Sequence, residues 1–215
     1  MNFLKYTSTT SASKNLSMTF DDGPNGNPTL EVLGILKEYQ IKATFFLIGK
    51  NIKNNESIVQ KIVQEGHSIG NHSYAHENFL IFQSEDGIRS NLERTNKVVF
   101  DTTGIRPRYF RPPNGLMSPK LQRVCSDLRL TPVGAHIFVN DSFMIDSSQI
   151  AKRILSEIRN GSYIIVLHDG FGTFRSRSRL VVAGALKLIL EKTISKLSYV
   201  TLDKFFETNK ESLIS

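Results

Sequence analysis

Apolar residues along the chain follow two alternating patterns. Short continuous runs, at 16–20, 43–48 and 163–167, are typical of buried strands. Between these runs, segments such as 29–39 place apolar residues every three or four positions, which predicts helices. Strands separated by helices indicate parallel βαβ units. About seven such units could close into a barrel or leave it partly open.

The expected elements cover most of the chain. We expect Gly66 to cap a helix, Ser84 to be an N-cap, and Ser118-Pro119 to begin a helix. The expected strands are 16–20, 43–48, 67–70, 109–110, 130–135, 163–167 and 199–202, and the expected helices are 29–39, 56–65, 84–100, one from 118, 147–159 and 179–196. Catalytic groups of parallel barrels gather at the C-terminal ends of the strands, so polar residues that follow these strands are the first candidates for a site.

Size and composition allow one large domain. The chain has 215 residues, of which 40% are hydrophobic and 22% charged, so a substantial core can form. Cys125 is the single cysteine, and no intramolecular disulfide is therefore possible. A chain without a disulfide fits a reducing compartment. We expect Cys125 to be a buried structural thiol on the apolar face of a helix.

The chain is basic, with a net charge of +7. Such a balance could favour anionic glycans, membranes or nucleic acid, but we interpret it as solvated surface charge, part of it from Arg175, Arg177 and Arg179. We find no nucleic-acid-binding module and expect no nucleic-acid partner. No stretch is apolar enough to span a bilayer, and residues 1–15 lack the core of a signal peptide. The protein either stays inside the cell or has lost a signal.

Two pairs of polar residues suggest metal chemistry. Asp21 and Asp22 end the first expected strand, and His72 and His76 are spaced so that both side chains can face one way on a helical turn. One carboxylate and two imidazoles leave open positions on a divalent metal that can activate water. The other carboxylate could then act as a base. Each pair alone is weak evidence, because Asp followed by Gly-Pro is also common in turns.

Two further residues follow expected strands. Arg111 precedes the stiff loop 112–115 and could hold a carboxylate by a bidentate bond, although an arginine at a strand end can also be merely solvated. His168 is best placed to be a general acid, because the end of the strand would fix its position. The alternative is a hydrogen-bonded histidine at a strand end with no catalytic role. His67 and His136 lack comparable surroundings, and we interpret them as structural.

Together these residues resemble a known family. In their order and spacing they look like the motifs of the polysaccharide deacetylase (NodB-homology) family, also called carbohydrate esterase family 4. The resemblance covers about residues 16–206 and implies an α/β fold, a distorted (β/α) barrel with about seven parallel strands. The matching segments are 19–24, 72–76, 111–115 and 166–168, supported by 43–49 and 65–72. On this basis we expect an N-terminal arm at 1–15, a catalytic domain at 16–207 and a C-terminal tail at 208–215.

The resemblance also implies a role for each matching residue. Asp21 would be the general base, Arg111 would orient it, and His168 would be the general acid. The metal, usually zinc or cobalt in this family, would be bound by Asp22, His72 and His76. On the substrate side, the backbone N–H near Asn114 would help hold the oxyanion, with Pro112 in the same loop, and Val166 would line a pocket for the acetyl methyl group.

One motif departs from the family pattern. The family usually carries an Asp-Trp pair whose aspartate tunes the catalytic histidine. Here Asp141 aligns with that aspartate, but Ser142 replaces the tryptophan, and Phe143 could fill part of the space. Asp141 is therefore the expected partner of His168, with Asp146 as the alternative. The missing tryptophan leaves sugar stacking and substrate preference open.

The resemblance implies a metal-dependent hydrolase that removes N-acetyl groups from a glycan containing N-acetylglucosamine, such as chitin oligomers or peptidoglycan. An O-acetyl esterase acting on xylan or another acetylated polymer is the alternative within the same chemistry. A non-catalytic glycan-binding relative is the alternative from another class of protein. The N-acetylated glycan is the partner expected for this chain.

Overall fold

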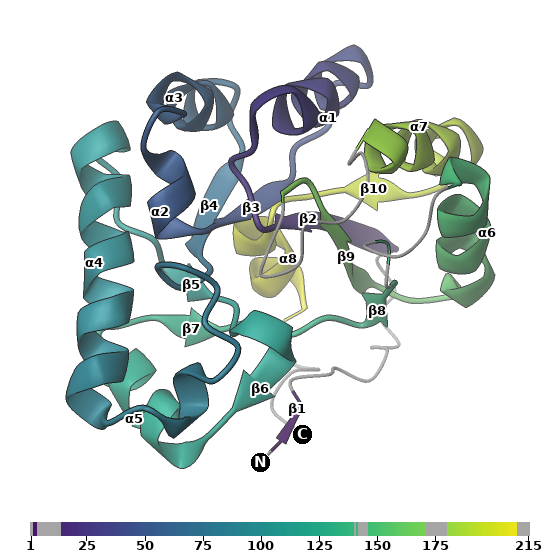
Figure 1. Cartoon of the computed structure of the whole chain (residues 1–215). Helices are drawn as coiled ribbons and strands as arrows, with labels where there is room; N and C mark the ends of the chain where they lie inside the picture. Colours follow the sequence, from purple (N-terminus) through teal and green to yellow (C-terminus); the bar gives the residue numbers. More distant parts are fainter. Residues whose placement is uncertain (1, 4–13, 140, 142–145, 171–179, 210–215) are drawn as a thin grey trace.

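A curled sheet of parallel strands forms the centre of the computed structural model, which describes residues 2–3, 14–139, 141, 146–170 and 180–209 (Figure 1). The strand order is β7-β5-β4-β3-β2-β9-β8, and β10 adds to β2 beside its first residues. The strands are β2 (Asn15–Asp21), β3 (Thr44–Leu47), β4 (Ser68–Asn71), β5 (Tyr109–Phe110), β7 (Thr131–Pro132), β8 (Ile137–Phe138), β9 (Tyr163–His168) and β10 (Ser198–Tyr199). The expected α/β class and distorted barrel are confirmed.

Helices cover the outside of this sheet, except for the last one, whose Leu202 and Phe205 pack with Phe46 and Ile164 on the inner side (Figure 1). Three of the expected caps are present: Ser84 and Ser118 accept hydrogen bonds from backbone N–H groups of the first helical turn, and Gly66 has the left-handed φ of +81° that follows a helix end. The helices are α1 (Gly26–Glu38), α2 (Gly49–Ile52), α3 (Glu56–Gln64), α4 (Glu85–Thr103), α5 (Pro119–Asp127), α6 (Ser147–Glu157), α7 (Leu180–Thr193) and α8 (Leu202–Thr208).

The C-terminal region differs from the sequence-based expectation. The predicted strand at 199–202 ends earlier, since β10 stops at Tyr199 and Leu202 begins α8, which the sequence pattern did not predict. Leu202 and Phe205 are both buried and lie three residues apart on one helical face. Two apolar positions were too few to separate a short helix from a strand.

Smaller elements complete the described fold. Strand β1 (Asn2–Phe3) pairs antiparallel with β6 (Leu116–Met117), and short 3-10 turns occur at Leu80–Phe82 and Pro113–Gly115. Residues 142 and 143 and the arginines at 175, 177 and 179 lie outside the described residues. Among the helices that the structure describes, none combines the length and the apolar character needed to cross a membrane.

The sheet curls into a barrel that stays open between its first and last strands, and the site lies beside this opening. Strands β7 and β8 are the two ends of the strand order, and residues 133–136 connect them. The largest apolar cluster packs the helix-facing side of the sheet, with Phe20, Phe45 and Leu167 among its fully buried members. Cys125 lies in a second apolar cluster under α5, and burial raises the pKa of its thiol to about 12, as expected for a structural cysteine.

Candidate active site

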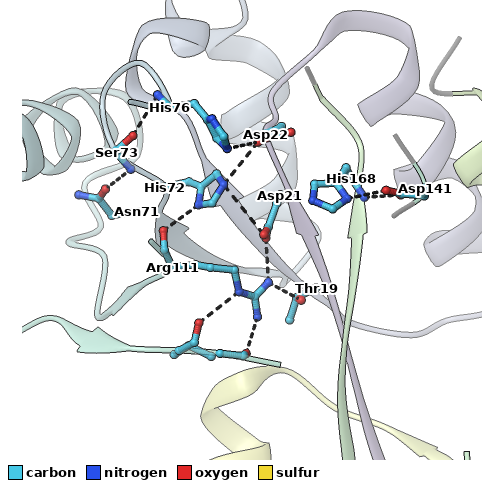
Figure 2. Close-up of polar contacts among 12 residues, drawn as sticks. Thr19, Asp21, Asp22, Asn71, His72, Ser73, His76, Arg111, Asp141 and His168 are labelled. Carbon is cyan, nitrogen blue, oxygen red and sulfur yellow. Dashed lines mark hydrogen bonds and ion pairs between the residues drawn. The ribbon is translucent and has the colours of Figure 1, made fainter. Parts of the chain in front are cut away.

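The candidate residues meet at the C-terminal ends of the strands. Asp21 ends β2 and lies directly opposite His168, which ends the neighbouring β9. His72 follows the last residue of β4, and Arg111 follows the last residue of β5. Parallel strands bring all their C-terminal ends to one rim of the barrel, so residues far apart in the sequence face a common space there. Figure 2 shows these side chains converging from four strands.

Asp22, His72 and His76 form the cluster predicted to bind a metal. One Asp22 oxygen, Oδ1, lies 3.4 Å from His72 Nε2 and 3.5 Å from His76 Nε2. One ligand atom from each residue lies within 4.8 Å of the others. Figure 2 shows the three side chains pointing toward one another. A carboxylate and two imidazoles in this arrangement are a suitable ligand set for zinc or a similar divalent ion.

The hydrogen bonds within the cluster support this fit. His72 Nδ1 donates to the backbone carbonyl of Arg111 at 2.7 Å, which leaves the lone pair of Nε2 directed toward Asp22. Asp22 Oδ1 is buried and accepts no hydrogen bond in the described part of the protein. A buried carboxylate oxygen without a donor is costly unless a cation binds it. The residues present therefore fit a divalent metal.

The expected helical turn at His72–His76 is wrong. Both histidines lie in an irregular turn after β4, in which Ser73 and His76 have positive φ angles of 64° and 54°. Asn71 Oδ1 accepts from the Ser73 N–H at 2.8 Å, and Ser73 Oγ accepts from the His76 N–H at 3.0 Å. These side chains replace helical hydrogen bonds, and the turn still brings both imidazoles to one side.

The loop that carries Asp22 is held from two sides. Asp22 has a φ of 74°, and its carbonyl oxygen accepts from Asn51 Nδ2 at 2.9 Å. On the other side, a Cβ at Gly170 would lie 2.0 Å from that carbonyl oxygen, so only glycine permits this approach. The buried carboxylate of Asp169 accepts from Thr29 Oγ1 at 2.6 Å and packs against Gly23. The loop therefore has little room to move Asp22.

Arg111 is paired with Asp21 in the interior. Its Nη1 lies 2.8 Å from Asp21 Oδ1 and also donates to Thr19 Oγ1. The predicted bidentate bond is wrong, because Nε and Nη2 donate instead to the carbonyl oxygens of Val133 and Gly134. Those carbonyls belong to the segment between β7 and β8, so the guanidinium spans the open edge of the barrel and fixes one oxygen of Asp21 (Figure 2).

His168 is tied to Asp141. Its Nδ1 donates to Asp141 Oδ1 at 2.6 Å, and its backbone N–H donates to Asp141 Oδ2 at 2.9 Å. The pair fixes the imidazole so that Nε2 faces away from Asp141. The alternative partner, Asp146, instead caps α6 by accepting from the Ser148 N–H at 2.7 Å. The structure thus brings Asp141 to His168 and does not bring Asp146 there.

The electrostatics of the metal cluster favour positive charge. Burial raises the pKa of Asp22, but the adjacent imidazole of His72 and the positive charges that His168, His72 and His76 can carry outweigh burial and hold that pKa well below its usual range. Burial lowers the pKa of His72, but Asp21, Asp22 and the Arg111 carbonyl raise it overall. For His76, burial and the charge of His72 lower the pKa to about 4. A bound cation would satisfy the carboxylates with both imidazoles neutral.

The two other titrating groups at the rim have raised pKa values. Burial lowers the pKa of His168, but Asp141, Asp22 and Asp21 outweigh it and raise the pKa to about 9. The pKa of Asp169 rises to about 7, chiefly through burial, with a contribution from the nearby Asp22. At neutral pH His168 therefore carries a proton that it can give to a substrate.

The three predicted substrate-side residues lie around the same rim. Val166 is buried in β9, two residues before His168 and on the same face of the strand. Pro112 is buried at the start of the 3-10 turn Pro113–Gly115. Asn114, in that turn, has a φ of 57°, and its side chain donates to Asn78 Oδ1 at 3.0 Å. The chain thus has a loop on one side of the cluster and β9 on the other.

Four residues hold the site in place although no role was predicted for them from the sequence: Thr19, Asn51, Asn71 and Asp169. Their signals were weak. Asn71 precedes the histidine turn, and asparagine commonly accepts from the N–H two residues later, as it does here. Asn51 belongs to a short helix without a clear apolar pattern. Thr19 lies in the matching segment 19–24 and Asp169 follows the segment 166–168, but their partners lie more than 90 positions away, which no local pattern reports.

Comparisons with known proteins place the chain beside carbohydrate deacetylases. A family model described as polysaccharide deacetylase matches residues 8–133. A peptidoglycan-N-acetylglucosamine deacetylase of Bacillus cereus is 32% identical over 196 residues, which cover 91% of this chain and 70% of that protein. A peptidoglycan-N-acetylglucosamine deacetylase of Listeria monocytogenes is 31% identical over 90% of this chain, but the matched part spans only 39% of that longer protein.

A solved structure gives the same comparison in three dimensions. The family 4 acetyl xylan esterase of Clostridium thermocellum, determined in complex with a cobalt ion, has a TM-score of 0.79 and is 32% identical. The match covers 92% of this chain and 92% of that one. The fold is therefore shared over nearly the whole chain.

Proposed function

The chain belongs to the polysaccharide deacetylase family, and we propose that it is a metal-dependent hydrolase that removes N-acetyl groups from oligo- or polysaccharides containing N-acetylglucosamine. The observation that carries the proposal is the placement of a base and an acid beside one metal-ligand cluster. Asp21 is fixed by Arg111, and His168 is fixed by Asp141, next to Asp22 and its two histidines. The named activity of the Bacillus relative supports the choice of substrate.

Asp22, His72 and His76 would hold the ion, for which zinc is the expected choice and cobalt the alternative. The cobalt in the Clostridium esterase supports a divalent ion at a site of this family. When bound, such an ion polarises the acetyl carbonyl and makes water easier to deprotonate. The remaining steps depend on side chains of this chain.

Asp21 would take the proton from the attacking water. Its Oδ1 is fixed by Arg111, and its Oδ2 lies 4.0 Å from His72 Nε2, next to the cluster. A carboxylate held by an arginine keeps its orientation through the reaction, and it does not have to be a metal ligand itself. Replacement of such a base typically lowers the rate by about two to four orders of magnitude.

His168 would protonate the departing amine. An amine is a poor leaving group without a proton, and the pKa of His168, raised to about 9 by Asp141, keeps the imidazole charged at neutral pH. Asp21 and His168 lie opposite each other in neighbouring strands. A substrate at the rim could therefore contact both the base and the acid, which lie side by side on one face of the sheet.

Three residues would complete the substrate side. We assign the backbone N–H near Asn114 to the developing oxyanion, and Pro112 to the shape of the same loop. Val166 would line the space for the acetyl methyl group, because it lies under His168 on the same face of β9. The catalytic domain would comprise residues 16–207, with an arm at 1–15 and a tail at 208–215, although α8 itself extends to Thr208.

An O-acetyl esterase is the second candidate function. The structural similarity to an acetyl xylan esterase favours it. An ester releases an alcohol, which needs less help from an acid than an amine does, so the same site could serve both reactions. The two functions differ in how strongly the rate depends on His168.

Acetate release tests the proposal directly. The purified protein, stripped by a chelator and then supplied with zinc or cobalt, is assayed on N-acetylglucosamine oligomers, peptidoglycan fragments and acetylated xylan. We expect metal-dependent release from the first two substrates and its loss in Asp21→Asn. Release from xylan alone would establish the esterase instead. Binding of oligomers without acetate release under any metal would favour a non-catalytic glycan-binding protein.

A further inference from the structure

Four phenylalanine side chains are well exposed in the part of the chain that the structure describes. The exposed fractions are 72% for Phe79, 67% for Phe82, 58% for Phe138 and 40% for Phe100. Phe79 and Phe82 contact each other, and the guanidinium of Arg106 lies over the ring of Phe100. Phe138 differs, because its ring contacts the candidate general acid: the ring centroids of Phe138 and His168 lie 5.9 Å apart.

The sheet register places Phe138 at the mouth of the barrel. Phe138 ends β8 and lies directly opposite Val166 of β9. Residues opposite each other in parallel strands point to the same face, and residues two apart in one strand do so as well. Phe138, Val166 and His168 therefore share one face. Ile137 points the other way and is buried in the helix-side cluster. An apolar ring thus remains accessible beside the acid.

We propose that Phe138 is a substrate-binding residue that stacks on a sugar ring of the glycan whose acetyl group enters the site. This inference rests on the proposed function. A pyranose has a face of C–H groups that packs well on an aromatic ring, and burying a phenylalanine side chain in such a contact is favourable. The chain contains no tryptophan, so stacking on a sugar must come from phenylalanine or tyrosine. Phe138 has both the exposure and the position.

Fluorescence tests the contact without relying on turnover. Because the chain has no tryptophan, Phe138→Trp introduces a single selectively excitable fluorophore beside His168. The variant is combined with Asp21→Asn, so that bound oligomer is not hydrolysed, and titrated with N-acetylglucosamine oligomers. We expect a saturable change in tryptophan emission. The matched control is Phe100→Trp in the same background, at an exposed phenylalanine near the C-terminal end of α4, away from the strand ends that carry the site, where we expect no change.

Kinetic measurements distinguish two roles for Phe138, stacking on the sugar and orienting His168. Phe138→Ala should raise KM for oligomers about tenfold, as expected for the loss of one aromatic contact, while kcat changes much less. The rise in KM should be smaller on an acetyl ester without a sugar. Phe138→Tyr keeps an aromatic ring and should retain most of the affinity for oligomers. A fall in kcat of equal size on both substrates, with a shifted pH profile, would assign Phe138 to orienting His168 and overturn the proposal.

The outcomes also separate this inference from the proposed function. If the wild-type protein releases no acetate but Phe138→Trp responds to oligomers, the stacking contact stands and the hydrolase does not. If acetate is released, but Phe138→Ala has the KM of the wild type and Phe138→Trp responds no more than the control tryptophan, the hydrolase stands and the stacking contact is wrong. Unchanged emission at position 138 under saturating oligomer would likewise reject it.

Discussion

Two pairs of histidines lie at opposite ends of the barrel strands. The imidazoles of one pair donate a hydrogen bond through Nδ1, and those of the other pair accept one there. At the C-terminal end, Nδ1 of His72 donates to the Arg111 carbonyl and Nδ1 of His168 donates to Asp141. Near the strand starts, Nδ1 of His67 accepts from the Ala43 N–H at 3.2 Å, and Nδ1 of His136 accepts from the Ile164 N–H at 3.0 Å. The residue type is the same and three of the four are buried, with the His168 side chain 13% exposed, whereas the partners of Nδ1 differ.

The difference in partner determines the charge that each ring can carry. An Nδ1 that accepts a backbone N–H must be unprotonated, and burial lowers the pKa of His67 and His136 to about 4. An Nδ1 that donates to an oxygen is compatible with a second proton or a metal on Nε2, and the pKa values of His72 and His168 are raised. Burial alone therefore does not separate these candidate site histidines from the structural ones, whereas the direction of the Nδ1 hydrogen bond separates His72 and His168 from His67 and His136.

Removal of a metal ligand should have the largest effect. His72→Ala takes away one of three ligand atoms and should reduce metal-dependent acetate release by about three orders of magnitude or more. Zinc binding, measured by calorimetry, should weaken in parallel. His67→Ala removes an equally buried histidine and should leave the zinc stoichiometry unchanged. Full metal-dependent activity in His72→Ala would show that the ligand assignment is wrong.

Loss of the acid should come next. His168→Gln keeps a side chain that can hydrogen-bond to Asp141 but cannot deliver a proton from a cation, and should lower kcat on N-acetylated oligomers by about two to four orders of magnitude. The loss should be clearly smaller on an acetyl ester, because an alcohol leaves more easily. Zinc binding serves as the control and should stay near that of the unmodified protein. Equal losses on amide and ester would argue against an acid role for His168.

A smaller effect should follow from changing the charge beside the acid. An acid must be protonated, so activity should fall as the pH rises through the His168 pKa of about 9. Asp141→Asn removes the nearest negative charge while burial continues to lower the pKa, and the alkaline limb should move toward or below the ordinary value of 6.5. Rates of acetate release between neutral and alkaline pH measure the shift. If the alkaline limb of the pH–rate profile does not shift in Asp141→Asn, a group other than His168 controls that limb.

Much of the fold could be predicted from apolar patterns. The long runs that became β2 and β9 are buried along their whole length or nearly so, and such runs have few alternatives in an α/β chain. The short elements were harder. Strand β10 and helix α8 depend on packing against β2, which lies far earlier in the chain, and a window of four residues carries no clear period. Tertiary contacts, rather than local preference, decided between strand and helix there.

The identity of the candidate site residues could also be anticipated, but not their geometry. The motifs placed Asp22, His72 and His76 together because strand ends meet at one rim. The sequence could not show that His76 reaches the cluster through a left-handed turn, or that Arg111 divides its donors between Asp21 and the segment after β7. Both depend on backbone groups from other elements, whose positions exist only in the folded chain.

The structural histidines give the smallest expected effect and the sharpest contrast. His67→Leu leaves the buried Ala43 N–H without its acceptor, which should lower the free energy of unfolding by about 1–3 kcal/mol. Acetate release per folded molecule should not change. In the wild type, the unfolded chain binds a proton near pH 6.5 and the folded His67 only near 4, so stability falls as the pH drops across this window.

His67→Leu removes that titration, and its stability should depend less steeply on pH between those values. Denaturant unfolding at several pH values measures both effects. His67→Gln, whose side-chain oxygen can accept the same N–H, is the matched variant and should recover part of the stability while keeping the shallower pH slope. An unchanged slope in both variants would place the titrating group elsewhere. A loss of acetate release in the folded variants would mean that an Nδ1 accepting a backbone N–H does not mark a histidine as structural.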